Sequence, residues 1–141
     1  MRHIKLALTL VLYFGLTLAT PTFADEVKLT PEDYALLIGK WEGTYESRNT
    51  DGKVVYTLDV RLDVVEDKLG KFWISKNNRE WGTTVQIVDG KVVLRFGRAE
   101  RPFVYAQQEG ATTLSVDYDA EFEGQPRKDS LVLTKKTNTS P

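Results

Sequence analysis

The stretch LLIGKWEGTYES, residues 36–47, decides the fold of this chain. It follows a helix start at 30–33, TPED, in which threonine suits the N-cap, proline the first helical position, and the acids the positive end of the helix dipole. Gly39 then ends the helix, because glycine readily adopts the backbone conformation that helix C-termini require. From Lys40 onward the residues alternate between apolar and polar. The sequence therefore predicts one short helix followed directly by a β-strand.

The alternation continues to Lys136 and is interrupted by a turn signal about every 8–14 residues, which is typical of an all-β sandwich or barrel. We expect no second helix of any length. We expect eight strands, at 40–47, 54–65, 70–75, 81–88, 91–97, 101–107, 112–122 and 127–136.

The turns predict the register of the strands. A two-residue turn at Asp51-Gly52 places Trp41 opposite Leu62 on one face and Glu42 opposite Arg61 on the other. A slip of one residue would exchange the two faces, so the agreement on both faces supports the pairing. The other turns predict these facing pairs: Phe72 with Thr83, Trp73 with Gly82, Val85 with Leu94, Thr83 with Phe96, Tyr105 with Leu114, Phe103 with Val116, Tyr118 with Leu131, and Glu121 with Lys128.

Each predicted hairpin has one apolar and one polar face. A flat sheet of eight such strands would leave two free edges and an uncovered apolar face, and closing the last strand onto the first removes both. The sequence therefore predicts an all-β fold, an eight-stranded antiparallel up-and-down β-barrel with a short N-terminal helix. A barrel of this size is filled by side chains or holds one small ligand.

The N-terminus has the three parts of a secretory signal peptide: basic MRHIK, apolar LALTLVLYFGLTL, and a small-x-small end at Thr22-Phe23-Ala24. The apolar run is shorter than the roughly 20 residues of a membrane-spanning helix, which favours cleavage over an anchor. We predict a cleaved signal peptide at 1–24, a barrel domain at 25–136 and a flexible tail at 137–141. The protein is then periplasmic or secreted.

The composition excludes several function classes. Removing 1–24 takes away Arg2 and Lys5, so 117 residues remain with 17 basic and 20 acidic side chains, a net charge of −3 that predicts no nucleic-acid partner. The single histidine, His3, is removed as well, and the chain has no cysteine. A Ser-His-Asp triad, thiolate catalysis and metal ligation by His or Cys are therefore excluded. We expect no enzyme, no metal and no cofactor.

The short helix, the Gly39-Lys40-Trp41 motif and the eight-strand meander together resemble the lipocalins and the wider calycin superfamily, in particular small exported bacterial lipocalin-like domains. The resemblance implies that Trp41 closes one end of the barrel beneath the helix, and that a basic residue of the last strand covers it. Lys135 takes that place here, where the family usually has arginine. Gly43 in GKWEGTY is also similar to the nitrobindin type, which implies haem held by histidine, and no histidine survives in the mature chain.

The opposite end of the predicted barrel is an aromatic throat, which we call the mouth. Its predicted inward residues include Ser47, Ile74, Trp81, Phe122 and Asp129. A small hydrophobic or amphipathic ligand fits such a lining, and an anionic head group would pair with a guanidinium at the rim. The predicted ligand contacts are Tyr45, Tyr56, Phe72, Phe96, Arg101, Phe103, Tyr118 and Arg127.

Two alternatives remain open at the mouth. The inward side chains are bulky enough to fill the barrel, with Arg101 pairing with Asp129 at the rim. The strand at 112–122 and the following turn contain enough acidic residues to include a catalytic pair of carboxylates: Asp117, Asp119, Glu121 and Glu123. Their alternation, however, places all four on one outer, solvated face.

Trp73 is predicted to face outward, and an exposed tryptophan can mark a partner surface. It supports a second class of function, in which the barrel is filled. The protein would then be a protein-binding inhibitor or a cell-envelope accessory protein that acts through its outer face or mouth loops.

Overall fold

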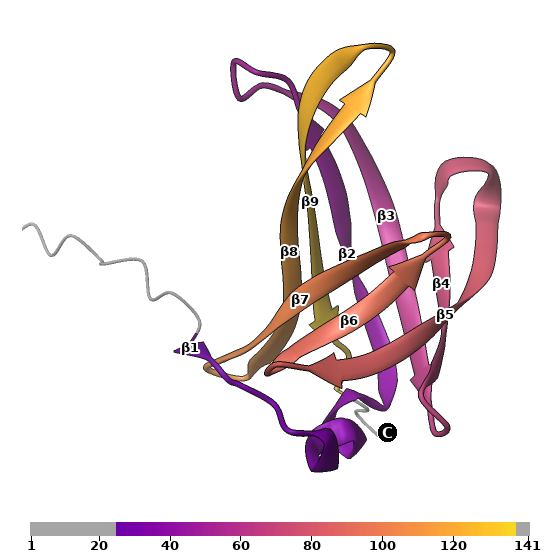
Figure 1. Cartoon of the computed structure of the whole chain (residues 1–141), viewed down its shortest axis with the longest axis vertical. Helices are drawn as coiled ribbons and strands as arrows, with labels where there is room; N and C mark the ends of the chain where they lie inside the picture. The colour runs from indigo at the N-terminus through magenta and orange to yellow at the C-terminus, as the bar shows by residue number, and fades with distance from the viewer. Residues whose placement is uncertain (1–24, 138–141) are drawn as a thin grey trace, which may run out of the picture.

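The computed structural model describes residues 25–137, which form a closed eight-stranded antiparallel β-barrel (Figure 1). Each strand pairs with the next in sequence and the last pairs with the first, so the predicted up-and-down order is confirmed. The strands are β2 (Gly39–Arg48), β3 (Val54–Val65), β4 (Leu69–Ile74), β5 (Arg79–Val88), β6 (Lys91–Phe96), β7 (Ala99–Gln108), β8 (Ala111–Phe122) and β9 (Gln125–Lys135). The predicted signal peptide at 1–24 and residues 138–141 of the predicted tail lie outside the described residues.

Three short elements complete the fold: β1 (Asp25–Glu26), which pairs with β7, and two 3₁₀ helices, η1 (Pro31–Leu37) and η2 (Lys76–Asn78). Helix η1 is the helix predicted before the first strand. Its capping box includes a bond from the Thr30 backbone N–H to Asp33 Oδ2 at 2.7 Å. Neither described helix has the length and apolar character needed to cross a membrane.

The core follows from the period of two along each strand, because alternate side chains point to opposite faces. On β3, for example, Val60, Leu62 and Val64 are buried, whereas Arg61 between them is exposed. The remaining buried hydrophobic side chains of the eight strands are Trp41, Phe72, Val85, Val92, Leu94, Phe103, Tyr105, Ala106, Leu114, Val116, Leu131 and Leu133.

The β2–β3 register is as predicted through most of the hairpin. Trp41 faces Leu62, and Glu42 faces Arg61 with a 3.8 Å ion pair on the outer face. The turn is longer than the two residues we predicted, because the Asn49 N–H bonds to Lys53 O and the register shifts after Ser47. On the other side of β2, a Cβ at Gly43 would stand 1.7 Å from Val132 O, so only glycine allows β2 and β9 this close.

Two predicted registers are wrong by two residues. In β8–β9 the turn is Glu123-Gly124, with φ of 50° and 76°, so Asp119 rather than Glu121 faces Lys128. Positive φ at both central residues marks a hairpin turn that continues the strand twist, and this turn displaces the predicted one. Tyr118 consequently faces Asp129 instead of Leu131.

The β4–β5 hairpin shows the same displacement, because its loop uses Asn77 and Asn78 at positive φ before β5 begins at Arg79. Phe72 therefore faces Trp81 instead of Thr83, and Trp73 faces Glu80 instead of Gly82. A slip of two residues leaves every side chain on its predicted face.

Two ladders stop earlier than predicted. Val85–Leu94 and Tyr105–Leu114 pair as expected, but Thr83 does not pair with Phe96, nor Phe103 with Val116. The β5–β6 ladder ends at Val85–Leu94 and the β7–β8 ladder at Val104–Ser115. Beyond these points the strands of each pair diverge, although β9 stays paired with β2 as far as Arg48–Lys128. The tip of the β8–β9 hairpin, residues 120–127, rises past the barrel with pairing only between its own strands (Figure 1). The barrel is thus open at the mouth.

Candidate ligand-binding cavity

The end of the barrel next to η1 is sealed by Trp41, which is fully buried. Its indole N–H donates to Leu37 O at 2.9 Å. The Lys135 ammonium donates to Leu36 O at 2.7 Å and stands 5.8 Å from the centre of the Trp41 ring. Gly39, at a φ of 132°, turns the chain from η1 into β2. The helix, the tryptophan and the lysine therefore form one floor, which we call the closed end.

The mouth encloses a cavity of about 620 Å³. Seven of the eight residues predicted to contact a ligand line it: Tyr45, Tyr56, Phe72, Phe96, Arg101, Tyr118 and Arg127. The eighth, Phe103, does not line it. Phe103 is fully buried below, opposite Val92 on β6, with its ring centre 6.3 Å from that of Phe96.

Aromatic rings form the floor and wall of the cavity. The Phe72 ring centre is 4.9 Å from that of Phe96 and 5.2 Å from that of Trp81, and the Tyr45 and Tyr56 rings meet edge to face at 6.5 Å. Edge-to-face and tilted contacts at these separations are favourable, so the rings hold one another in place.

Sequence reasoning missed several lining residues, among them Val55, Lys76, Ala99, Ala120 and Glu121. Glu121 is predicted to lie on the outer face, but it lies where the β8–β9 hairpin extends past the barrel. Val55 lies next to the shift of register at the end of the β2–β3 hairpin. Ala120 lies two residues from Tyr118 on β8 and therefore points to the same, inward face. Its small side chain on an inward position is the signal that could have identified unfilled space there.

A polar cluster lies on four neighbouring strands of the cavity wall, β7, β8, β9 and β2. The Tyr45 hydroxyl donates to Asp129 Oδ2 at 2.5 Å, and Asp129 is only 7% exposed. The other oxygen, Oδ1, is buried and has no hydrogen-bond partner. Arg101 does not pair with Asp129 as one alternative predicted. Its guanidinium instead lies 4.1 Å from the ring centre of Tyr118, the cross-strand partner of Asp129.

Burial raises the pKa of the Tyr45 phenol, and the hydrogen bond and negative charge of Asp129 raise it further. Burial and the Asp129 charge also raise the pKa of Tyr118, and Arg101 offsets part of that effect. Both phenols therefore stay protonated at neutral pH. Tyr45 is the donor and Asp129 the acceptor in their hydrogen bond.

Trp73, the predicted partner surface, lies half-buried on the outer face of β4. Its indole N–H donates to Asn78 Oδ1 at 2.6 Å, and the Arg61 guanidinium lies 4.3 Å from the ring centre. The ring is therefore already engaged on both its polar edge and its face by groups of the same chain.

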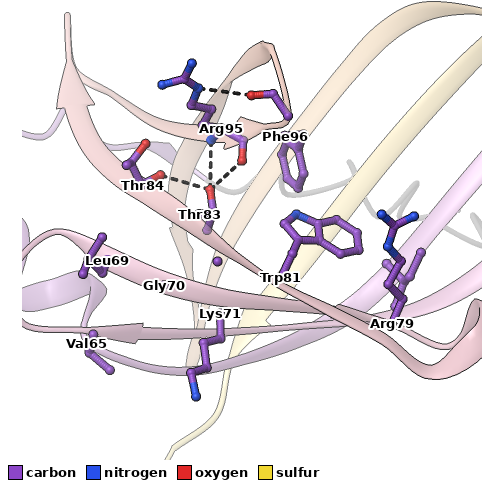
Figure 2. A pocket seen from close by; sticks show the side chains of 13 residues that line it. Val65, Leu69, Gly70, Lys71, Arg79, Trp81, Thr83, Thr84, Arg95 and Phe96 are labelled. Atoms are coloured by element: carbon purple, nitrogen blue, oxygen red, sulfur yellow. Dashed lines mark hydrogen bonds between the residues drawn. The ribbon is translucent and has the colours of Figure 1, made fainter.

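A second hollow, of about 850 Å³, was not predicted. It lies along the gap where β5 and β6 diverge (Figure 2). The Thr83 hydroxyl bridges the gap by donating to Arg95 O at 2.7 Å and accepting from Arg95 N–H at 3.0 Å. The groove shares Ile74, Trp81 and Phe96 with the mouth cavity, so the two adjoin. Its aromatic lining is limited to Trp81 and Phe96, and the mouth is therefore the better candidate site.

The acidic residues Asp117 and Asp119 of β8 do not line the cavity. Asp117 and Asp119 are exposed, and Asp119 bonds to Lys128 at 2.8 Å. Across residues 25–137, no three His, Cys, Asp or Glu side chains lie close enough together to hold a metal ion. Comparison of the sequence with protein-family models gives no match, and comparison with curated proteins gives none either.

Proposed function

We propose that this protein is an exported, non-enzymatic, lipocalin-like binding protein that holds one small hydrophobic or amphipathic molecule in its mouth. One observation carries the proposal: a cavity of about 620 Å³ with an aromatic floor and a few polar groups at its rim. Cavities of roughly 300–1,000 Å³ with mainly apolar walls are typical of small-molecule sites.

The contrast between the two ends of the barrel supports this function over a filled barrel. Side chains pack completely around Trp41 and Leu37 at the closed end. At the mouth, Phe96, Trp81 and Tyr118 are only partly buried although they face inward. A ligand would cover these rings and gain roughly 25 cal/mol for each Å² of apolar surface removed from water.

The closed end also supports the lipocalin-like assignment. The Gly39-Lys40-Trp41 motif opens the first barrel strand beneath a short helix, and Lys135 covers the tryptophan. Export rests on the predicted signal peptide at 1–24. The alternative function, a protein-binding inhibitor or envelope accessory protein acting through Trp73, has less support, because Arg61 and Asn78 already occupy that indole.

A cavity-blocking variant tests the proposal. We expect wild-type protein to bind the neutral fluorophore N-phenyl-1-naphthylamine with a saturable rise in fluorescence. Ala120→Trp places a large ring in the mouth and should abolish that rise. Asp117→Trp, on the exposed face of the same strand, is the matched control and should bind as wild type does. Equal binding by both variants would show that the mouth is not the site.

A further inference from the structure

Asp129 is the least satisfied polar side chain of the cavity wall. It is 93% buried, and one of its oxygens accepts a hydrogen bond from Tyr45. The second oxygen, Oδ1, has no partner and is screened from water. A buried, charged acceptor without a donor is costly, so such groups in native proteins call for an explanation.

In the folded protein, Oδ1 is closed to bulk solvent. A group that enters the cavity, which Asp129 lines, can supply the missing donor.

The charges around Asp129 restrict what that group can be. Arg101 lies over the ring of Tyr118, which faces Asp129 across the strands, and Arg127 lines the same rim. The cavity lining carries three cations, Arg101, Arg127 and Lys76, against the two acids Asp129 and Glu121, so its net charge repels a cationic donor. An anionic head group would be repelled by Asp129 and has no proton to donate to Oδ1. A neutral hydroxyl avoids both repulsions, because it donates to the carboxylate and still accepts from a guanidinium.

We propose that the mouth selects a neutral, hydroxyl-bearing amphiphile, whose O–H donates to Asp129 Oδ1 while its apolar chain lies on the aromatic floor. This inference rests on the proposed function and replaces the anionic head group predicted from Arg101 and Arg127 with an alcohol. The proposal requires that Tyr118, the half-buried cross-strand partner of Asp129, shift far enough to expose Oδ1 to the hydroxyl.

The test compares three amphiphiles of one chain length, 1-decanol, decanoate and decylammonium, by calorimetric titration at neutral pH. Wild-type protein should bind 1-decanol at least about tenfold more tightly than either ion. Decanoate has no proton to donate to Oδ1, and a hydrogen bond to a charged acceptor is worth about that factor, while decylammonium is repelled by the net positive charge of the lining. In Asp129→Asn the amide oxygen keeps the Tyr45 bond, and an NH₂ group replaces Oδ1. That variant should lose the preference for the alcohol and bind decanoate most tightly.

Asp119→Asn is the matched control, because it removes the same charge from the exposed face of the neighbouring strand. It should keep the wild-type order of affinities. If Asp129→Asn does not fold, the order of the three head groups on wild-type protein decides alone. Equal affinities, or tightest binding of either ion by wild-type protein, would overturn this inference and leave the cavity proposal standing. If neither the three amphiphiles nor N-phenyl-1-naphthylamine binds, both this inference and the proposed function are wrong.

Discussion

The two ends of the barrel differ in how completely their side chains are packed and their polar groups are hydrogen-bonded. At the closed end, the indole N–H of Trp41 and the ammonium of Lys135 each bond to a carbonyl of η1, and the rings beneath are fully buried. At the mouth, two ladders end early, aromatic rings stay partly exposed, and a buried carboxylate oxygen lacks a donor. The closed end thus stabilises the fold, while the mouth contains an open cavity and a carboxylate oxygen without a hydrogen-bond donor.

That difference separates stability from function within one small domain. Packing at the closed end can stabilise the barrel without help from a ligand, so the mouth is free to remain incompletely packed. Residues of the same type should therefore differ in effect according to the end they occupy. The following predictions compare the ends, beginning with the largest expected effect.

Trp41→Ala should lower the free energy of unfolding by about 3–5 kcal/mol, because it leaves a large cavity and orphans the Leu37 carbonyl. Trp81→Ala, at the mouth, should cost less than half as much, since Trp81 is only half-buried. Urea denaturation of both variants measures the difference. Equal losses would mean that the two ends are packed alike.

Tyr45→Phe should cost about 1–3 kcal/mol, because it removes the hydrogen bond of the buried Asp129 carboxylate. Tyr56→Phe, exposed at the rim of the same cavity, should change the midpoint of denaturation very little. A Tyr45→Phe variant as stable as wild type would show that this hydrogen bond does not stabilise the protein.

Lys135→Met should cost about 1 kcal/mol, since the thioether chain still covers Trp41 but no longer bonds to Leu36 O. Lys135→Arg should restore most of the loss, because guanidinium can donate to the same carbonyl. Thermal unfolding monitored by circular dichroism is sufficient here. A stabilising effect of methionine would contradict the proposed role of Lys135.

The smallest effect is expected in alkaline solution, because the tyrosines concerned are partly exposed. Folding raises the pKa of Tyr45 and Tyr118, so the folded state keeps protons that the unfolded chain releases above its own pKa near 10. Their contribution to stability is complete below that pH and is lost as pH rises through the raised pKa values. Urea midpoints at pH 8 and pH 11 should therefore differ more for wild type than for Tyr45→Phe. The same difference in midpoint for wild type and Tyr45→Phe would show that Tyr45 does not contribute to the pH dependence of stability.

Sequence reasoning reached the fold because alternation and turn chemistry are local signals. It located all eight strands and assigned most inward residues, and even the two hairpins displaced by two residues kept their faces. The errors came from turn geometry: Glu123-Gly124 and Asn77-Asn78 adopt positive φ, and non-glycine residues at positive φ are hard to anticipate from sequence. After a shift of two residues, a side chain stays on its predicted face of the sheet but faces a different residue on the neighbouring strand.

The candidate site was predictable in composition but not in contacts. The alternation of inward and outward residues brought seven of the eight predicted ligand residues to the cavity, yet it could not tell that Phe103 lies too deep in the core to line it. The pairing of Tyr118 with Asp129 depended on the displaced turn, so the Tyr45–Asp129 bond and the partnerless Oδ1 had no signal in the sequence.

The most direct test of the central claim, that the mouth holds a ligand, is native mass spectrometry of the mature protein isolated from its own host. We predict a reproducible added mass of small-lipid or metabolite size on wild-type protein, recoverable by solvent extraction and missing from Ala120→Trp. A wild-type spectrum with the mass of the polypeptide alone, or an added mass that Ala120→Trp retains, would contradict the account.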